Sequence, residues 1–137
     1  MSEQRRPYRS RRPWLEFTFL TPDGLRADVD LVADTGYPFD FILCPELYDL
    51  LVRADLGIVP KTNFGDLPAG LVRMYMPEIG FVESVRALRS DRVGAILERE
   101  HPTFVGLVGL PVLRLGEYGG NATDFWFRYP PPTPIAP

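Results

Sequence analysis

The chain has 137 residues, 45% of them hydrophobic and 24% charged, which predicts one soluble globular domain with a core of its own. No stretch approaches the roughly 18 consecutive apolar residues of a membrane-spanning helix, so we expect no membrane partner and a cytoplasmic location. The single cysteine and single histidine exclude an intrachain disulfide and a cysteine- or histidine-rich metal site.

Charge is unevenly distributed along the chain. The first twelve residues contain five arginines and one glutamate, although the whole chain has a net charge of −3. We interpret residues 1–13 as a basic, disordered arm ahead of an acidic body. Contact of this arm with nucleic acid is an alternative, which the acidic body and the lack of a recognisable binding motif disfavour.

Strand signals open the body of the chain. Residues 14–20 are rich in aromatic side chains, residues 21–24 form a Thr-Pro-Asp-Gly turn, and residues 27–33 return as a second strand. This hairpin leads directly into Asp34. Strand character resumes at residues 39–43, and a helix begins at Pro45, with an apolar stripe that we expect to end near Gly57.

Short strands fill most of the second half. Residues 61–70 are polar and contain two glycines, which predicts a mobile loop, and strands are expected at 71–76, 81–88, 93–97 and 125–129. The aromatic strands at 14–20 and 125–129 are candidates for an interface between two chains. Residues 130–137 form a proline-rich, extended tail, for which docking to a proline-binding module is an alternative to a simple spacer. The pattern predicts a mainly β, barrel-like domain with one or two short helices.

Two motifs indicate a specific chemistry. Asp34-Thr35-Gly36 places a carboxylate at the end of a strand, immediately before a tight turn. Some seventy residues later, the segment 104–113 presents Leu107-Val108-Gly109 followed by a short apolar, helix-like stretch.

Together these segments resemble the retropepsin-like aspartic proteases, the single-domain relatives of pepsin. The resemblance covers residues 14–129 and implies a retropepsin-like closed β-barrel that hydrolyses peptide bonds without cofactor or metal. By this resemblance Asp34 is the catalytic acid or base, Thr35 and Gly36 support its loop, and Leu107, Val108 and Gly109 form the apolar backing of that loop.

The resemblance also implies a homodimer acting on a peptide or protein substrate. Two carboxylates must face each other across one water, and each chain has a single Asp-Thr-Gly motif, so two copies of Asp34 would meet on a two-fold axis. A flap that closes over the substrate is expected, with its tip within the segment that contains Phe64, Gly65 and Gly70. An ordinary surface loop is the alternative for that segment.

Tyr37-Pro38 departs from the family pattern, which continues with Ala and then Ser or Thr at these positions. Tyr37 is bulkier than Ala, and Pro38 supplies neither a hydroxyl nor an N–H. A catalytically inactive dimeric domain is therefore an alternative function. Asp34 as a plain turn residue is a further alternative, which the paired motifs disfavour. A cysteine hydrolase built from Cys44 and His101 is another, disfavoured because a lone cysteine with apolar neighbours is more often buried packing.

Overall fold

Backbone hydrogen bonds organise residues 2–131, the part of the chain that the computed structural model describes, into two sheets. The smaller sheet has the strand order β1-β10-β9, and the larger one has the order β2-β3-β8-β4-β7-β6-β5. Pairing of β2 with β6 closes six strands of the larger sheet into a barrel. The strands are β1 (Glu3–Pro7), β2 (Trp14–Leu20), β3 (Arg26–Asp34), β4 (Phe41–Leu43), β5 (Ala54–Thr62), β6 (Gly65–Met76), β7 (Phe81–Arg89), β8 (Phe104–Gly109), β9 (Glu117–Gly120) and β10 (Asp124–Arg128).

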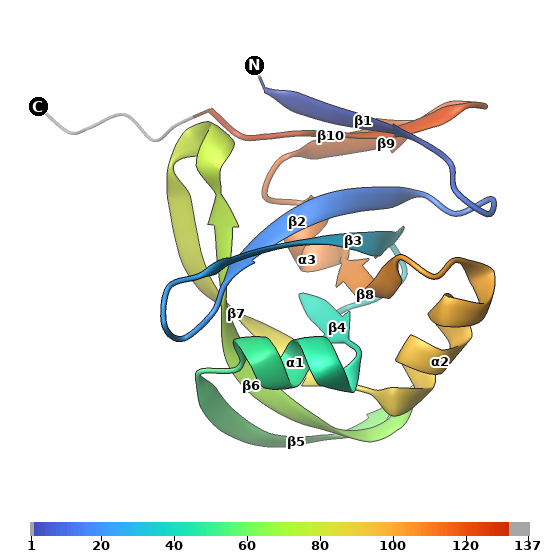
Figure 1. Cartoon of the computed structure of the whole chain (residues 1–137). Helices are drawn as coiled ribbons and strands as arrows, with labels where there is room; N and C mark the ends of the chain where they lie inside the picture. The colour runs from blue at the N-terminus through green and yellow to red at the C-terminus, as the bar shows by residue number, and fades with distance from the viewer. Residues whose placement is uncertain (1, 132–137) are drawn as a thin grey trace, which may run out of the picture.

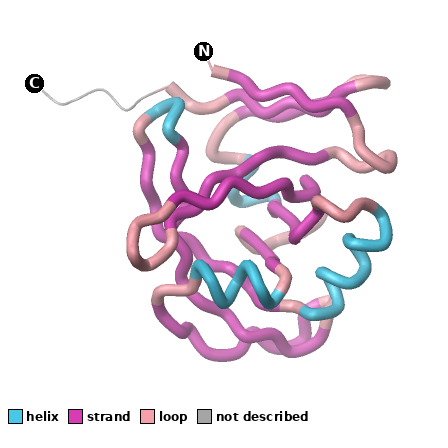
Figure 2. The backbone as a smooth tube through the Cα atoms, viewed as in Figure 1, coloured by secondary structure: helices cyan, strands magenta, loops and turns pink. Residues whose placement is uncertain are grey.

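Four short helices connect these strands, namely α1 (Pro45–Leu51), η1 (Pro77–Ile79), α2 (Asp91–Glu100) and α3 (Leu110–Leu113). Figure 1 shows the small sheet as a separate layer above the barrel, with α1 and α2 on the barrel's outer side, and Figure 2 shows how strongly strands dominate. Strand accounts for 55% of the structure and helix for 18%, so the prediction of a mainly β, closed-barrel domain with few short helices is confirmed. Within residues 2–131 no helix has the length and apolar character needed to cross a bilayer.

The predicted hairpin ahead of Asp34 is present. The five-residue loop between β2 and β3 is closed by a hydrogen bond from the Thr21 N–H to the Leu25 carbonyl, and Gly24 has the left-handed φ of +86° that favours glycine. Alternate residues of β2 face the interior, where the rings of Phe17 and Phe19 meet the ring of Phe41 edge-on at 5.6 and 5.0 Å. The apolar face of β2 therefore fixes the register of the strand that ends in Asp34.

The expectation of a disordered arm over residues 1–13 is wrong. Residues 3–7 form β1, which pairs antiparallel with β10, and the chain then turns at Ser10 and Arg11 before entering β2. Two of the five arginines are paired with acidic partners brought from far along the chain. Arg9 contacts Asp30 at 2.7 Å, and Arg12 contacts Glu100 at 2.7 Å. Composition alone does not reveal such partners, which is why the segment reads as a solvated tail in the sequence.

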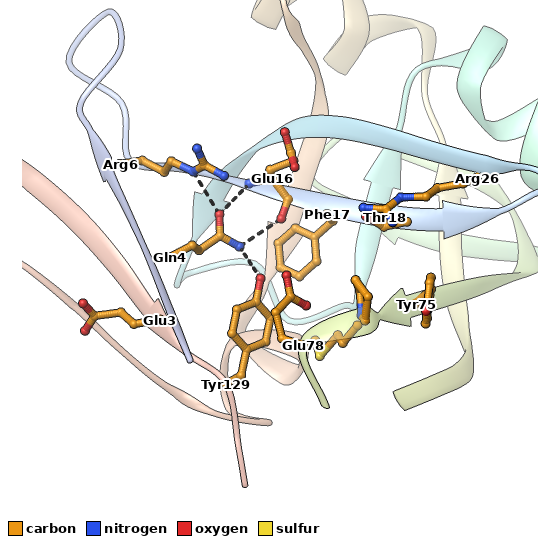
Figure 3. A pocket seen from close by; sticks show the side chains of 12 residues that line it. Glu3, Gln4, Arg6, Glu16, Phe17, Thr18, Arg26, Tyr75, Glu78 and Tyr129 are labelled. Carbon is orange, nitrogen blue, oxygen red and sulfur yellow. Dashed lines mark hydrogen bonds between the residues drawn. The ribbon is translucent and has the colours of Figure 1, made fainter. Parts of the chain in front are cut away.

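Gln4 attaches β1 to the barrel (Figure 3). Its side-chain amide donates to the Glu16 carbonyl and to the Tyr129 hydroxyl, both at 2.9 Å, and its Oε1 accepts from the Glu16 N–H at 2.9 Å. The carboxamide thus pairs with both backbone groups of Glu16 in the way that a neighbouring strand would. Besides a 3.2 Å bond that its Oε1 accepts from Arg6 of the same strand, every hydrogen bond of this buried amide joins the small sheet to the large one or to the chain end.

Three predicted element boundaries are also corrected. The expected mobile loop at 61–70 belongs to the β5–β6 hairpin, whose turn is Asn63-Phe64, and α1 ends at Leu51 instead of continuing toward Gly57, which lies in β5. The expected strand at 93–97 is the helix α2. Ser90 caps this helix by accepting a hydrogen bond from the Val93 N–H at 3.2 Å, and an apolar run of this length fits either a helix or a strand by periodicity.

The final predicted strand is present as β10, but of its aromatic side chains only Trp126 is partly exposed. Phe125, Phe127 and Tyr129 are buried in the chain's own core, as are Trp14, Phe17 and Phe19 of β2. These aromatic side chains are therefore not available for the interface between chains that the sequence suggests. Of the predicted proline-rich tail, residues 132–137 lie outside the described residues.

Candidate active site

Asp34 is the last residue of β3, and its backbone lies beside Gly109 of the parallel strand β8. Its Oδ1 accepts a hydrogen bond from the Gly36 N–H at 3.0 Å, and its carbonyl accepts one from the Tyr37 N–H at 3.1 Å. These two bonds close a tight loop. Asp34 is half-buried, whereas Thr35 and Gly36 are exposed, so the carboxylate lies at the mouth of the barrel within reach of solvent.

The end of β8 holds this loop in place. The Gly109 N–H donates to the Asp40 carbonyl, and the Leu110 N–H donates to the Tyr37 carbonyl, both at 2.9 Å. The contact is so close that a Cβ on Gly109 would lie 1.8 Å from the Phe39 carbonyl oxygen and 2.8 Å from that of Tyr37. Glycine at position 109 is thus required by the approach of two backbones, not by a left-handed φ.

Gly36 supports the Asp34 loop through its N–H. Close approach of backbone at this position is not observed, because a Cβ there would meet only Asp34 Oδ1, at an ordinary contact distance of 3.4 Å. Its φ also lies outside the left-handed region. What Gly36 contributes is its N–H, which bonds the carboxylate, and the glycine that permits close packing at this site is Gly109.

Leu107 and Val108 are both buried, at 5% and 0% exposure. Val108 lies between Ala33 of β3 and Phe41 of β4, and Leu107 lies between Val32 and Ile42 of the same strands. Because successive side chains of a strand alternate, these two residues fill the two apolar clusters on opposite faces of the sheet. The strand that supports the Asp34 loop is therefore packed on both faces.

Tyr37 is 5% exposed and lies in the apolar cluster that also contains Trp14 and Leu97. Its hydroxyl has no hydrogen-bond partner among the described residues. Burial, together with the negative charges of Asp34 and Asp40, raises the pKa of this phenol well above its usual range. The phenol is therefore neutral, and its proton lies inside the protein near the candidate carboxylate.

The β5–β6 hairpin corresponds to the segment in which a flap was expected. Phe64 lies in its turn and Gly65 follows with a φ of +91°, while Phe64 and Val59 pack against the cluster that contains Tyr37. Gly70 is not at the tip. It lies within β6, where a Cβ would approach the Tyr48 hydroxyl of α1 too closely, so this glycine serves the packing of α1 on the hairpin.

The comparisons with known proteins add nothing to this geometry. No protein-family model, curated protein or solved structure matches the chain. The functional assignment therefore rests on the residues themselves.

Arg12 and its partner Glu100 belong to no motif of the sequence, yet the register of β2 on β3 brings Arg12 toward Asp34. A hydrogen bond of 3.0 Å from the Ala33 N–H to the Pro13 carbonyl extends the β2–β3 ladder past Trp14 and Val32, and the next pair in this register is Arg12 and Asp34. The Arg12 guanidinium donates to both carboxylate oxygens of Glu100, at 2.7 and 3.2 Å. The antiparallel register of the hairpin predicted around residues 21–24 sets Arg12 across from Asp34, so the sequence does hold a signal for Arg12. No sequence signal indicates Glu100.

Two cavities within residues 2–131 are not lined by Asp34. The one in Figure 3, about 100 Å³, lies between β1, β2 and the end of β6, several residues along the hairpin from Asp34. A larger groove of about 450 Å³ is lined by residues of α1, α2 and the start of β8, including Cys44. Burial raises the pKa of the Cys44 thiol, which disfavours the thiolate that a cysteine hydrolase would need.

Within the described residues no three His, Cys, Asp or Glu side chains gather as a metal site.

Proposed function

We propose that the protein is a retropepsin-like aspartic endopeptidase that works as a homodimer. The observation that carries this proposal is the Asp34 loop, in which a solvent-accessible carboxylate at the end of β3 is hydrogen-bonded by the Gly36 N–H and held against the Gly109 end of β8. The β5–β6 hairpin, whose turn packs on the same apolar cluster as Tyr37, supports it as the candidate flap.

The mechanism requires a second chain. Two Asp34 carboxylates facing each other at about 3 Å hold one proton between them, because two like charges at that distance cannot both ionise. The ionised member then accepts a proton from the attacking water, and the protonated member donates a hydrogen bond to the scissile carbonyl. Asp34 lines none of the cavities described above, which fits a substrate cleft that forms only between two chains.

A catalytically inactive, dimeric binding domain is the second candidate. The observation in its favour is that Pro38 supplies no hydroxyl or N–H to the loop, while the carboxylate of Asp34 accepts its hydrogen bond from Gly36. Under this reading the same dimer forms, but its carboxylates are supported too weakly to hold a water for attack.

Nucleic-acid contact through the arginines has less support from the contacts. Arg9 and Arg12 are paired with Asp30 and Glu100, and Arg5 contacts Glu3, so much of the positive charge is already neutralised. The proposed location is the cytoplasm, in keeping with the single cysteine of the chain.

The test is the substitution Asp34→Asn, which removes the ionisable group from both halves of the site at once. Cleavage of a diverse peptide library should fall by at least about a thousand-fold, with the far-ultraviolet circular dichroism unchanged. Asp91→Asn is the matched control, because this carboxylate lies at the start of α2 with its side chain 83% exposed, and its loss should leave cleavage unchanged.

A mixing experiment adds a test of the dimer. When equal amounts of wild-type and Asp34→Asn chains are unfolded and refolded together, about a quarter of the dimers should contain two wild-type chains, so activity should fall below half. Activity that falls to half and no further would show that one chain suffices. Failure of the wild-type protein to cleave any library peptide between acidic and neutral pH would leave the inactive binding domain.

A further inference from the structure

We propose that Arg12, held in place by Glu100, is a positioning residue that sets the electrostatic environment of Asp34. This inference deepens the proposed function and rests on it for its catalytic consequence, although the coupling between the three side chains is a property of the fold. The juxtaposition that carries it is the β2–β3 register, which ends in the bond between Ala33 and Pro13 and, continued by one pair, sets Arg12 across from Asp34, combined with the two hydrogen bonds of Arg12 to Glu100.

The backbone around Arg12 is built to place this side chain. Ser10 and Arg11 both adopt a left-handed conformation, with φ of 51° and 63°, which costs free energy for residues other than glycine. The turn is fixed by paired backbone hydrogen bonds between Arg9 and Arg12 and by a 2.7 Å bond from the Ser10 hydroxyl to the Glu100 carbonyl. The turn is thus tied to the same end of α2 that supplies the partner of Arg12.

Stability gives little reason for the ion pair. The Arg12 and Glu100 side chains are 42% and 32% exposed, and pairs this exposed contribute little to the free energy of unfolding. The attraction between Arg12 and Glu100 and that between Arg12 and Asp34 both favour the charged guanidinium. Glu100 therefore holds the Arg12 side chain in place, and the Arg12 cation can in turn stabilise the carboxylate of Asp34.

The other charged and titratable groups to consider lie on the loop that follows Asp34 and at the end of α2 that holds Arg12. Tyr37 and Asp40 lie on the loop, with the phenol neutral. His101 follows Glu100, and its Nδ1 lies 2.9 Å from the Thr103 hydroxyl, while β8 places the uncharged Gly109 beside Asp34. Arg12 is thus the cation that the β2–β3 register places opposite the carboxylate, and Glu100 partly offsets its charge.

Two substitutions that break the same ion pair should act in opposite directions. In Arg12→Gln the cation is lost, the ionised form of the Asp34 pair becomes less stable, and the acidic limb of the kcat/KM profile should move to higher pH by about half a unit. In Glu100→Gln the cation stays and its offsetting charge is lost, so the same limb should move to lower pH. Arg12→Lys should restore much of the wild-type profile.

A purely structural ion pair would predict that both variants behave alike. Arg128→Gln and Glu117→Gln are the controls, since they break a comparable 2.9 Å pair between β10 and β9. The same titrations followed through the ¹³C signal of the Asp34 carboxyl, assigned with Asp34→Asn, need no peptidase activity. Opposite shifts in that signal support the inference even if no peptide is cleaved, whereas shifts in the same direction, or none, overturn it.

Discussion

At the scale of single residues, Tyr37 and Tyr129 form a natural comparison. Both are buried, at 5% and 7% exposure, but the Tyr129 hydroxyl accepts a hydrogen bond from Gln4, whereas the Tyr37 hydroxyl has no partner among the described residues. A buried polar group without a partner costs free energy that its removal recovers, while removing a bonded one leaves the partner unsatisfied. The two phenols should therefore respond oppositely to loss of the oxygen.

We predict that Tyr37→Phe raises the free energy of unfolding by about 1 kcal/mol and that Tyr129→Phe lowers it by about 1 kcal/mol. Urea denaturation followed by tryptophan fluorescence measures both. If Tyr37→Phe destabilised the protein as much as Tyr129→Phe does, the Tyr37 hydroxyl would have a partner such as a bound water. In that case the hydroxyl would be a polar part of the Asp34 site.

At the scale of elements, β1 is an integral strand of the fold. Its register against β10 places Gln4 opposite Phe127, and the side chain of Gln4 then replaces a strand neighbour for Glu16. Three polar groups outside β1 therefore depend on one carboxamide, namely the N–H and carbonyl of Glu16 and the hydroxyl of Tyr129. The attachment of the small sheet to the barrel should be sensitive to this residue.

Gln4→Leu should lower the free energy of unfolding by about 2 kcal/mol, because the substitution keeps the volume but leaves these groups without their bonds. Arg5→Leu, the same change at an exposed neighbour on the same strand, should alter stability by less than about 0.5 kcal/mol. Thermal and urea denaturation of both variants provide the comparison. If Gln4→Leu and Arg5→Leu changed the free energy of unfolding equally, the hydrogen bonds of Gln4 would contribute little to the attachment of β1 to the barrel.

At the scale of the whole molecule, the proposed two-fold axis must pass near Thr35. Apart from the partly exposed Trp126, the aromatic side chains of β2 and β10 are buried within the chain, whereas Thr35 and Gly36 are exposed, so the proposed interface would form around the loop that follows Asp34. In an isologous dimer a residue close to the axis meets its own copy. Thr35 is therefore the position at which a chain should be most easily linked to its partner.

We predict that Thr35→Cys, in a Cys44→Ser background, forms a disulfide-linked dimer under mild oxidation, since cysteines pair when their Cα atoms lie within about 7 Å. Asn121→Cys, exposed in the turn between β9 and β10, is the control and should remain largely monomeric on a non-reducing gel. Sedimentation velocity of the wild-type protein at micromolar concentration should show a dimer. A monomer at all concentrations, with no linkage at Thr35, would rule out the shared-proton mechanism.

The local features of this protein were determined by its sequence. The β2–β3 hairpin follows from alternating aromatic residues and a Pro-Asp-Gly turn, and Asp34 at the end of that hairpin follows from the chain order, because these signals depend on neighbouring residues.

Tertiary contacts decided the rest. The run from Val93 to Leu97 suits either a strand or a helix, and packing against β8 made it a helix. β1 joined the fold through Gln4 and Tyr129, 125 residues apart, and Arg12 met Glu100 across 88 residues. Pairings over such separations depend on how the whole chain closes, which no local pattern of residues records.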